Sequence, residues 1–109
     1  MERVYNKLVR DKIPEIISGK GETPVARILS DEEYKKSLEE KLFEECKEVI
    51  ESNGENRLEE LADLIEIIKS LAESENSSLD QVINISNNKR EKRGGFDKRI
   101  FLEKVIEKQ

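Results

Sequence analysis

The sequence contains no histidine and no tryptophan, a single cysteine (Cys46), and few aromatic residues, which make up 5% of its 109 positions. The lack of histidine excludes Ser–His and Cys–His nucleophilic catalysis and argues against a zinc site. A lone cysteine excludes an internal disulfide and is typical of a reducing compartment. We see neither an apolar run of membrane length nor a signal-peptide pattern. We therefore expect a cytoplasmic protein that has no membrane partner.

Charged residues are abundant, at 41% of the sequence, and the net charge is −5. An acidic balance argues against nucleic acid as a bulk partner, because duplex binding relies on cation–phosphate contacts. This composition approaches that of disordered chains. Leu, Ile and Val nevertheless recur at helical spacing, so we expect an all-α fold in one domain over residues 1–109. A chain of this size buries only a modest core, and association is a common remedy.

Helix start signals divide the chain into segments. Residues 12–18 predict a short helix with Asp11 as its cap. Ser30 and Glu33 match a capping box, which predicts a long helix to about Ser52. Its apolar side chains lie along one stripe: Leu38, Leu42, Cys46, Val49 and Ile50. Cys46 is therefore expected to be a small core residue, since no base is placed to activate it.

Two further helices follow in the second half of the chain. Asn56 with Glu59 predicts a start for a helix that runs to about residue 75, and Ser78 with Gln81 starts another that reaches about residue 92. Gly94–Gly95 should end the last one. Residues 24–29 are rich in branched side chains and suggest a small strand. Residues 99–106 have two readings, a strand that pairs with residues 24–29 or a final helix.

The second long helix is apolar around most of its circumference. Its apolar residues are Leu58, Leu61, Ala62, Leu64, Ile65, Ile67, Ile68, Leu71 and Ala72. A helix of this kind is buried on nearly all sides, which three helices of one small chain cannot easily achieve. We therefore expect a homodimer or homotetramer with a four-helix bundle at its core.

Four carboxylates have the spacing of a cation site. Glu45 and Glu48 are three residues apart on the first long helix, and Glu60 and Asp63 are three apart on the second. Residues at this spacing share a helix face, and antiparallel packing would bring the two pairs together. Mg²⁺ prefers such oxygen ligands and often bridges to phosphate. Glu-rich helices also produce this spacing by chance, and lysine or arginine would equally serve as the charge partner.

Basic residues cluster at both ends of the chain. Those near the C-terminus are Lys89, Arg90, Lys92 and Arg93, directly before Gly94–Gly95, and those near the N-terminus are Lys7, Arg10 and Lys12. A glycine turn after a basic helix end allows backbone N–H groups to approach phosphate. The alternative is a helix C-terminus at which the dipole favours cations, together with a solvated basic segment near the N-terminus.

Three segments of the chain, taken together, resemble one enzyme family. EECKE (residues 44–48) followed by ELAD (residues 60–63) is similar to the signature of the MazG-like all-α nucleoside triphosphate pyrophosphohydrolases. Dimeric dUTPases and phosphoribosyl-ATP pyrophosphohydrolase are relatives in this superfamily. YNKLVRDKIPEII (residues 5–17) resembles the start of a MazG-like subgroup, and KREKRGGFDKRIFLE (residues 89–103) resembles its end.

The resemblance implies hydrolysis of a nucleotide at the α–β phosphoanhydride, which gives a monophosphate and pyrophosphate. House-cleaning of non-canonical nucleotides and a biosynthetic role are the two alternatives for its purpose. Glu45, Glu48, Glu60 and Asp63 match the metal ligands, with Mg²⁺ as the expected ion and Mn²⁺ as the alternative. Glu45 or Glu48 would accept the proton of the attacking water. Substrate contacts are expected from Glu44, Lys7, Arg10, Lys89, Arg90 and Arg93. Eleven residues separate Glu48 from Glu60, which leaves little room for elements that read the base.

Two readings of another class stay open. One is a nucleotide-binding or regulatory module that keeps the same fold without turnover. The other is a helical dimerisation module that has no ligand. A true cation site would raise the melting temperature when Mg²⁺ is added, and a plain dimerisation module would not respond.

Overall fold

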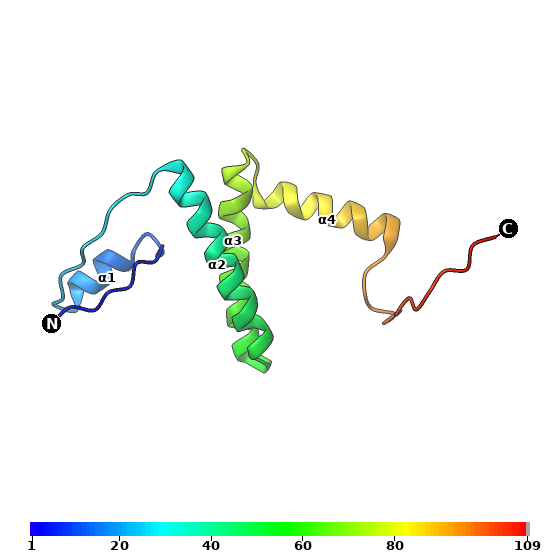
Figure 1. Cartoon of the computed structure of the whole chain (residues 1–109), viewed down its shortest axis with the longest axis horizontal. Helices are drawn as coiled ribbons and strands as arrows, with labels where there is room; N and C mark the ends of the chain where they lie inside the picture. Colours follow the sequence, from blue (N-terminus) through cyan, green and yellow to red (C-terminus); the bar gives the residue numbers. More distant parts are fainter. Residues whose placement is uncertain (109) are drawn as a thin grey trace.

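The computed structural model describes residues 1–108, and within them the regular structure is entirely helical. Helices α2 (Asp31–Glu51) and α3 (Gly54–Ser74) lie side by side and antiparallel (Figure 1). Helices α1 (Ile13–Gly19) and α4 (Leu79–Arg93) project to opposite sides of this pair. The prediction of an all-α fold is confirmed. No helix within residues 1–108 has both the length and the apolar character needed to span a membrane.

The strands expected at the periphery do not form. Residues 24–29 join α1 to α2 as an irregular segment, and residues 99–106 are neither strand nor helix. The branched side chains in these segments favour an extended backbone, but a strand also needs a partner for its N–H and C=O groups. The two segments lie at opposite ends of the molecule (Figure 1). Sequence pattern alone could not reveal that separation.

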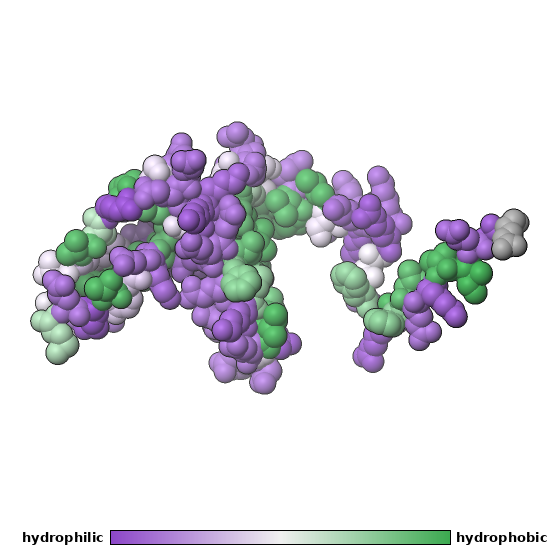
Figure 2. Space-filling view, viewed as in Figure 1, coloured by the Kyte–Doolittle hydropathy of each residue, from purple (hydrophilic) through white to green (hydrophobic). Residues whose placement is uncertain are grey.

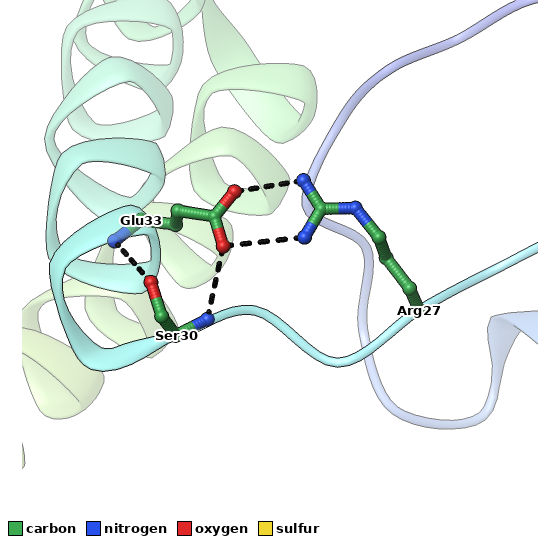
Figure 3. Close-up of polar contacts among 3 residues, drawn as sticks. All are labelled: Arg27, Ser30 and Glu33. Atoms are coloured by element: carbon green, nitrogen blue, oxygen red, sulfur yellow. Dashed lines mark hydrogen bonds and ion pairs between the residues drawn. The ribbon is translucent and has the colours of Figure 1, made fainter.

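The start of α2 is held by the predicted capping box. The backbone N–H of Glu33 donates to Ser30 Oγ at 3.2 Å, and the Ser30 N–H donates back to Glu33 Oε1 at 3.2 Å. Arg27 adds two hydrogen bonds to the same carboxylate (Figure 3). These bonds satisfy donors that a helix start otherwise leaves free. Chiefly because of Arg27, the pKa of Glu33 is lowered to about 2.

The connection between α2 and α3 is short, and Arg57 closes it. Its Nε donates to the carbonyl oxygens of Val49 at 3.2 Å and Ser52 at 2.9 Å, and its Nη2 donates to that of Ile50 at 3.5 Å. The last carbonyls of α2 therefore gain partners. The predicted start of the second long helix at Asn56 is wrong by about one turn. The helix begins at Gly54, with Asn53 in the capping position.

The start of α1 and the two ends of α4 are three further helix boundaries predicted from the sequence. Asp11 does not cap α1, because Lys12 is the capping residue and no side chain bonds there. Ser78 caps α4 as predicted, since its side chain accepts from the Gln81 N–H. Gly94 ends α4 with a φ of 84°, a left-handed backbone that glycine adopts without steric cost.

The core of the single chain is small. Within residues 1–108, only Leu38 on α2 and Ile67 and Ala72 on α3 are buried, with 3%, 7% and 8% of their surface exposed. Of the rest of the α2 stripe, Leu42, Cys46 and Val49 are half-buried and Ile50 is exposed. Cys46 is a free thiol on that stripe.

Much apolar surface stays exposed. The chain has a radius of gyration of 19.3 Å and a solvent-accessible surface of 10566 Å². A compact monomer of this size has a radius of about 13 Å and a surface of about 6,200 Å². Leu58, Leu61 and Ile65 form an exposed stripe on α3. Figure 2 shows further hydrophobic surface along the C-terminal segment. The single chain therefore leaves about 4,000 Å² more surface in water than a compact fold would.

Candidate metal centre

The short turn between α2 and α3 places carboxylates of the two helices side by side. Height below means the distance of a residue from this turn along its helix axis. Glu45 lies seven residues before Ser52, and Glu60 lies seven residues after Asn53. At 1.5 Å per residue, both are about 10 Å from the turn. Asp63 lies one helical turn farther along α3 than Glu60, on the same face. Because Glu45 and Glu60 are equally far from the turn, the hairpin brings carboxylates of both helices together at one site.

Glu45, Glu60 and Asp63 form the centre of this site. One carboxylate oxygen from each residue lies within 4.8 Å of the other two, and all three residues are half-buried. Glu45 Oε2 and Glu60 Oε2 are inaccessible to solvent and have no hydrogen-bond partner. Buried carboxylate oxygens without a donor are costly. The two oxygens therefore mark a place where a cation or a proton is needed.

Glu48, the fourth predicted ligand, is placed differently. It lies one turn of α2 closer to the hairpin turn than Glu45, so its height differs from that of Asp63 by about 9 Å. Its carboxylate is nevertheless close enough to those of Glu45 and Glu60 to raise the pKa of both. The structure thus brings three of the four predicted ligands around one point and sets Glu48 beside them.

The electrostatics of the cluster favour protonation when no cation is bound. Burial raises the pKa of Glu45 from 4.5 to about 7, and Glu48 and Asp63 contribute to the same shift. The neighbouring Glu48 carboxylate, together with burial, also raises the pKa of Glu60. Like charges this close cannot all ionise cheaply. Near neutral pH part of the molecules therefore carry a proton within the cluster.

The donor set fits a hard divalent cation. Carboxylate oxygens are the ligands that Mg²⁺ and Mn²⁺ take in proteins, and Mg²⁺ usually keeps several waters. Three carboxylates from two helices leave positions for those waters. The two unpartnered oxygens would gain the positive partner that the chain itself does not supply. Glu45, Glu60 and Asp63 are therefore the residues that would hold the ion.

The N-terminal segment reaches the cluster through two ion pairs. Lys7 Nζ lies 3.1 Å from Glu44 Oε1, and Arg10 Nη2 lies 2.8 Å from Asp63 Oδ1. Residues of this segment also line a cavity of about 200 Å³ against α2. Tyr5, Asn6 and Lys7 form one side of it, and Ser37 and Glu44 belong to the other side. Lys7, Arg10 and Glu44, three predicted substrate contacts, are thus collected near the carboxylates.

The basic residues of α4 are not collected there. Helix α4 packs against α3 at its start, has no comparable contact with α2, and extends away from the hairpin (Figure 1). Arg90 pairs with Asp97 at 2.9 Å, while Lys89 and Arg93 are exposed. Within one chain these predicted substrate contacts lie apart from the carboxylates, and their role stays a prediction.

One residue that matters for the site had no interpretation from the sequence. Arg57 fixes the turn on which the matching heights of Glu45 and Glu60 depend. Its signal was weak, because a single arginine in the first turn of a helix is ordinary. Its bonds to the carbonyl oxygens at the end of α2 could not be predicted from the sequence, because they depend on how the chain folds back at the turn.

Comparison with known proteins gives little further guidance. No family model matches the chain, and no solved structure matches it. The chain is similar to an uncharacterized protein of Mycolicibacterium smegmatis, with 56% identity over 43 residues. The similar stretch covers 39% of this chain and 44% of that protein, so the match spans less than half of the relative's length.

Proposed function

We propose that the chain is a magnesium-dependent nucleotide pyrophosphohydrolase that works as a homo-oligomer. It would hydrolyse the α–β phosphoanhydride of a nucleoside triphosphate or related nucleotide and release a monophosphate and pyrophosphate. The observation that carries this proposal is the convergence of Glu45, Glu60 and Asp63, with two buried oxygens lacking a donor. The resemblance of EECKE and ELAD to the MazG-like signature supplies the reaction class.

The residues divide into three roles. Glu45, Glu60 and Asp63 would hold Mg²⁺, which, when bound, offsets the charge that develops on the phosphate oxygens. Glu48 lies outside the triad and is therefore free to accept the proton of an attacking water. Lys7 and Arg10 would approach the phosphates, because phosphoryl transfer depends mainly on positioning and charge. The cavity beside Tyr5 and Asn6, which Lys7 and Glu44 also line, would offer room for part of the nucleoside.

The exposed surface supports self-association as part of this proposal. An obligate interface buries a total of about 2,000–5,000 Å², roughly 1,000–2,500 Å² from each partner, and the excess of about 4,000 Å² per chain is more than enough to supply it. Leu58, Leu61 and Ile65 on α3 and Phe43 and Ile50 on α2 are exposed apolar residues that a second hairpin would cover. Such packing would complete a four-helix bundle. It would also offer a way to bring the cations of α4 toward carboxylates of a partner.

The test is a screen for pyrophosphate release. Canonical, deoxy and modified nucleoside triphosphates are offered with Mg²⁺, with Mn²⁺ and with a chelator. We expect metal-dependent turnover that Glu60→Gln and Asp63→Asn abolish. Glu59→Gln is the matched control, because Glu59 is exposed and adjoins Glu60. Full activity in both site variants would refute the assignment. Nucleotide binding without any turnover would instead favour a nucleotide-binding module.

A further inference from the structure

The N-terminal segment is tied to the hairpin mainly by charge. Residues 1–12 form no regular structure except a turn before α1, and α1 itself has no buried residue. Of this segment, only Leu8 is half-buried. The ion pairs Lys7–Glu44 and Arg10–Asp63 link it to α2 and α3 across 37 and 53 residues of sequence. Both pairs end on residues at the candidate metal centre or next to it.

The Arg10 guanidinium contacts Asp63, one of the residues that would bind the cation. Its Nη2 lies 2.8 Å from Asp63 Oδ1, and a Mg–O bond is about 2.1 Å long. An ion held by the same oxygen would lie within about 5 Å of the guanidinium. The two positive charges would then repel each other across a short, partly desolvated gap. A filled metal site and an intact Arg10–Asp63 pair therefore disfavour one another.

The ion pair between Arg10 and Asp63 is weak enough for a divalent cation to break it. The side chains of Arg10 and Asp63 are 58% and 44% exposed, and an exposed ion pair shifts an equilibrium by no more than about fivefold. Arg10 also bonds only one member of the triad, since Glu45 Oε2 and Glu60 Oε2 stay without a partner. A divalent ion would satisfy all three residues together and would outweigh the single contact.

We infer that Arg10 is a place-holding cation, which occupies Asp63 in the metal-free chain and is released when a divalent cation binds, so that its guanidinium becomes available to an anionic phosphate group of the ligand. This role deepens the proposed function and rests on the proposed metal site. Arg10 is a positioning residue in the first state and a ligand contact in the second. Lys7, whose partner Glu44 lies outside the triad, does not share the first role.

The test follows the Arg10 side chain directly. In the ¹⁵N-labelled chain its Nε–Hε signal is assigned by its loss in Arg10→Gln, and Mg²⁺ is then titrated. We expect the signal to move in step with Mg²⁺ binding measured by calorimetry, and to move again when pyrophosphate is added. The Mg²⁺ affinity of Arg10→Gln, measured by calorimetry, should be roughly two- to fivefold higher than that of the wild-type chain. Lys7→Gln removes the same charge nearby and should change the affinity less.

The outcomes separate the two proposals. Wild-type binding of Mg²⁺ with an unmoved Arg10 signal overturns the place-holding role and leaves the metal site standing. Equal gains in Arg10→Gln and Lys7→Gln also overturn it, because general electrostatics then accounts for the effect. An Arg10 signal that ignores pyrophosphate overturns the release to phosphate. Absence of Mg²⁺ binding in both wild type and Arg10→Gln overturns the metal site, and the place-holding role with it.

Discussion

Without metal, the stability of the chain should fall as the pH rises from 5 to 8. The pKa of Glu45 is raised by burial from 4.5 to about 7. Between these values the folded chain keeps a proton that the unfolded chain has lost. Unfolding then releases a proton, so the free energy of unfolding decreases with rising pH and levels off above pH 7. Glu60, whose pKa is also raised, acts in the same direction.

The size of the effect follows from the shift at Glu45. A pKa moved from 4.5 to about 7 sets an upper limit of roughly 3 kcal/mol. Solvent reaches part of the half-buried cluster and screens its charges, so we expect ~1–2 kcal/mol. For a chain of this length, that loss lowers the melting temperature by about 5–15 °C. The chain has no histidine, which removes the usual source of titration in this window.

The assay is thermal unfolding followed by circular dichroism at pH 5, 6, 7 and 8, at one protein concentration and with a chelator present. Fixed concentration matters because association changes the apparent stability. Glu45→Gln should flatten the pH profile, since glutamine cannot titrate. Glu51→Gln, an exposed residue on the same helix, should leave the profile unchanged. Saturating Mg²⁺ at pH 8 should restore stability, by about 2.7 kcal/mol at a hundredfold excess over Kd.

Two results would refute this reasoning. One is a melting temperature that rises from pH 5 to pH 8 in the chelator, which would mean that carboxylates with lowered pKa dominate the window. Glu33 is of that kind, with a pKa of about 2, but its contribution is present above 4.5 and is lost only at lower pH. The other is an equal slope in Glu45→Gln, which would place the titration elsewhere.

The remaining predictions concern the fold and its assembly. Ser30→Ala removes one half of the capping box and should cost ~1 kcal/mol, seen as a lower melting temperature; an unchanged value would mean that the helix start is held by other contacts. Leu61→Asp and Ile65→Asp place charge on the exposed apolar stripe of α3 and should shift sedimentation toward monomer. Glu66→Lys, at an exposed position of the same helix away from the stripe, is the control, and association that survives in the two stripe variants would locate the interface elsewhere.

The helices and the ligand spacing could be predicted because both are local properties. Ser30 with Glu33 marks the start of α2, and Ser78 with Gln81 marks that of α4. The start of α3 was misplaced because Asn53 takes the capping position without a side-chain bond. A capping residue that makes no bond leaves no pattern in the sequence beyond its identity.

Which carboxylates meet at the site could not be predicted from spacing alone. It depends on how far each residue lies from the turn along its helix. Spacing alone treated Glu45, Glu48, Glu60 and Asp63 as equivalent. The position of the turn decides that Glu45 faces Glu60, that Asp63 lies on one side, and that Glu48 lies on the other. The contact of Arg10 with Asp63 crosses 53 residues of irregular and helical chain. No local signal predicts such a contact.

The turn that Arg57 closes aligns the triad through contacts between residues close in sequence. All three members of the triad lie within 19 consecutive residues, 45–63, and the turn that aligns them is closed by bonds between residues at most eight apart. Contacts of such low order form early and quickly when a chain folds. Inserting one residue between Ser52 and Asn53 would lengthen the non-helical connection and disturb the bonds that Arg57 makes across it. The alignment of Glu45 with Glu60 therefore depends on the length of this turn as well as on the carboxylates themselves.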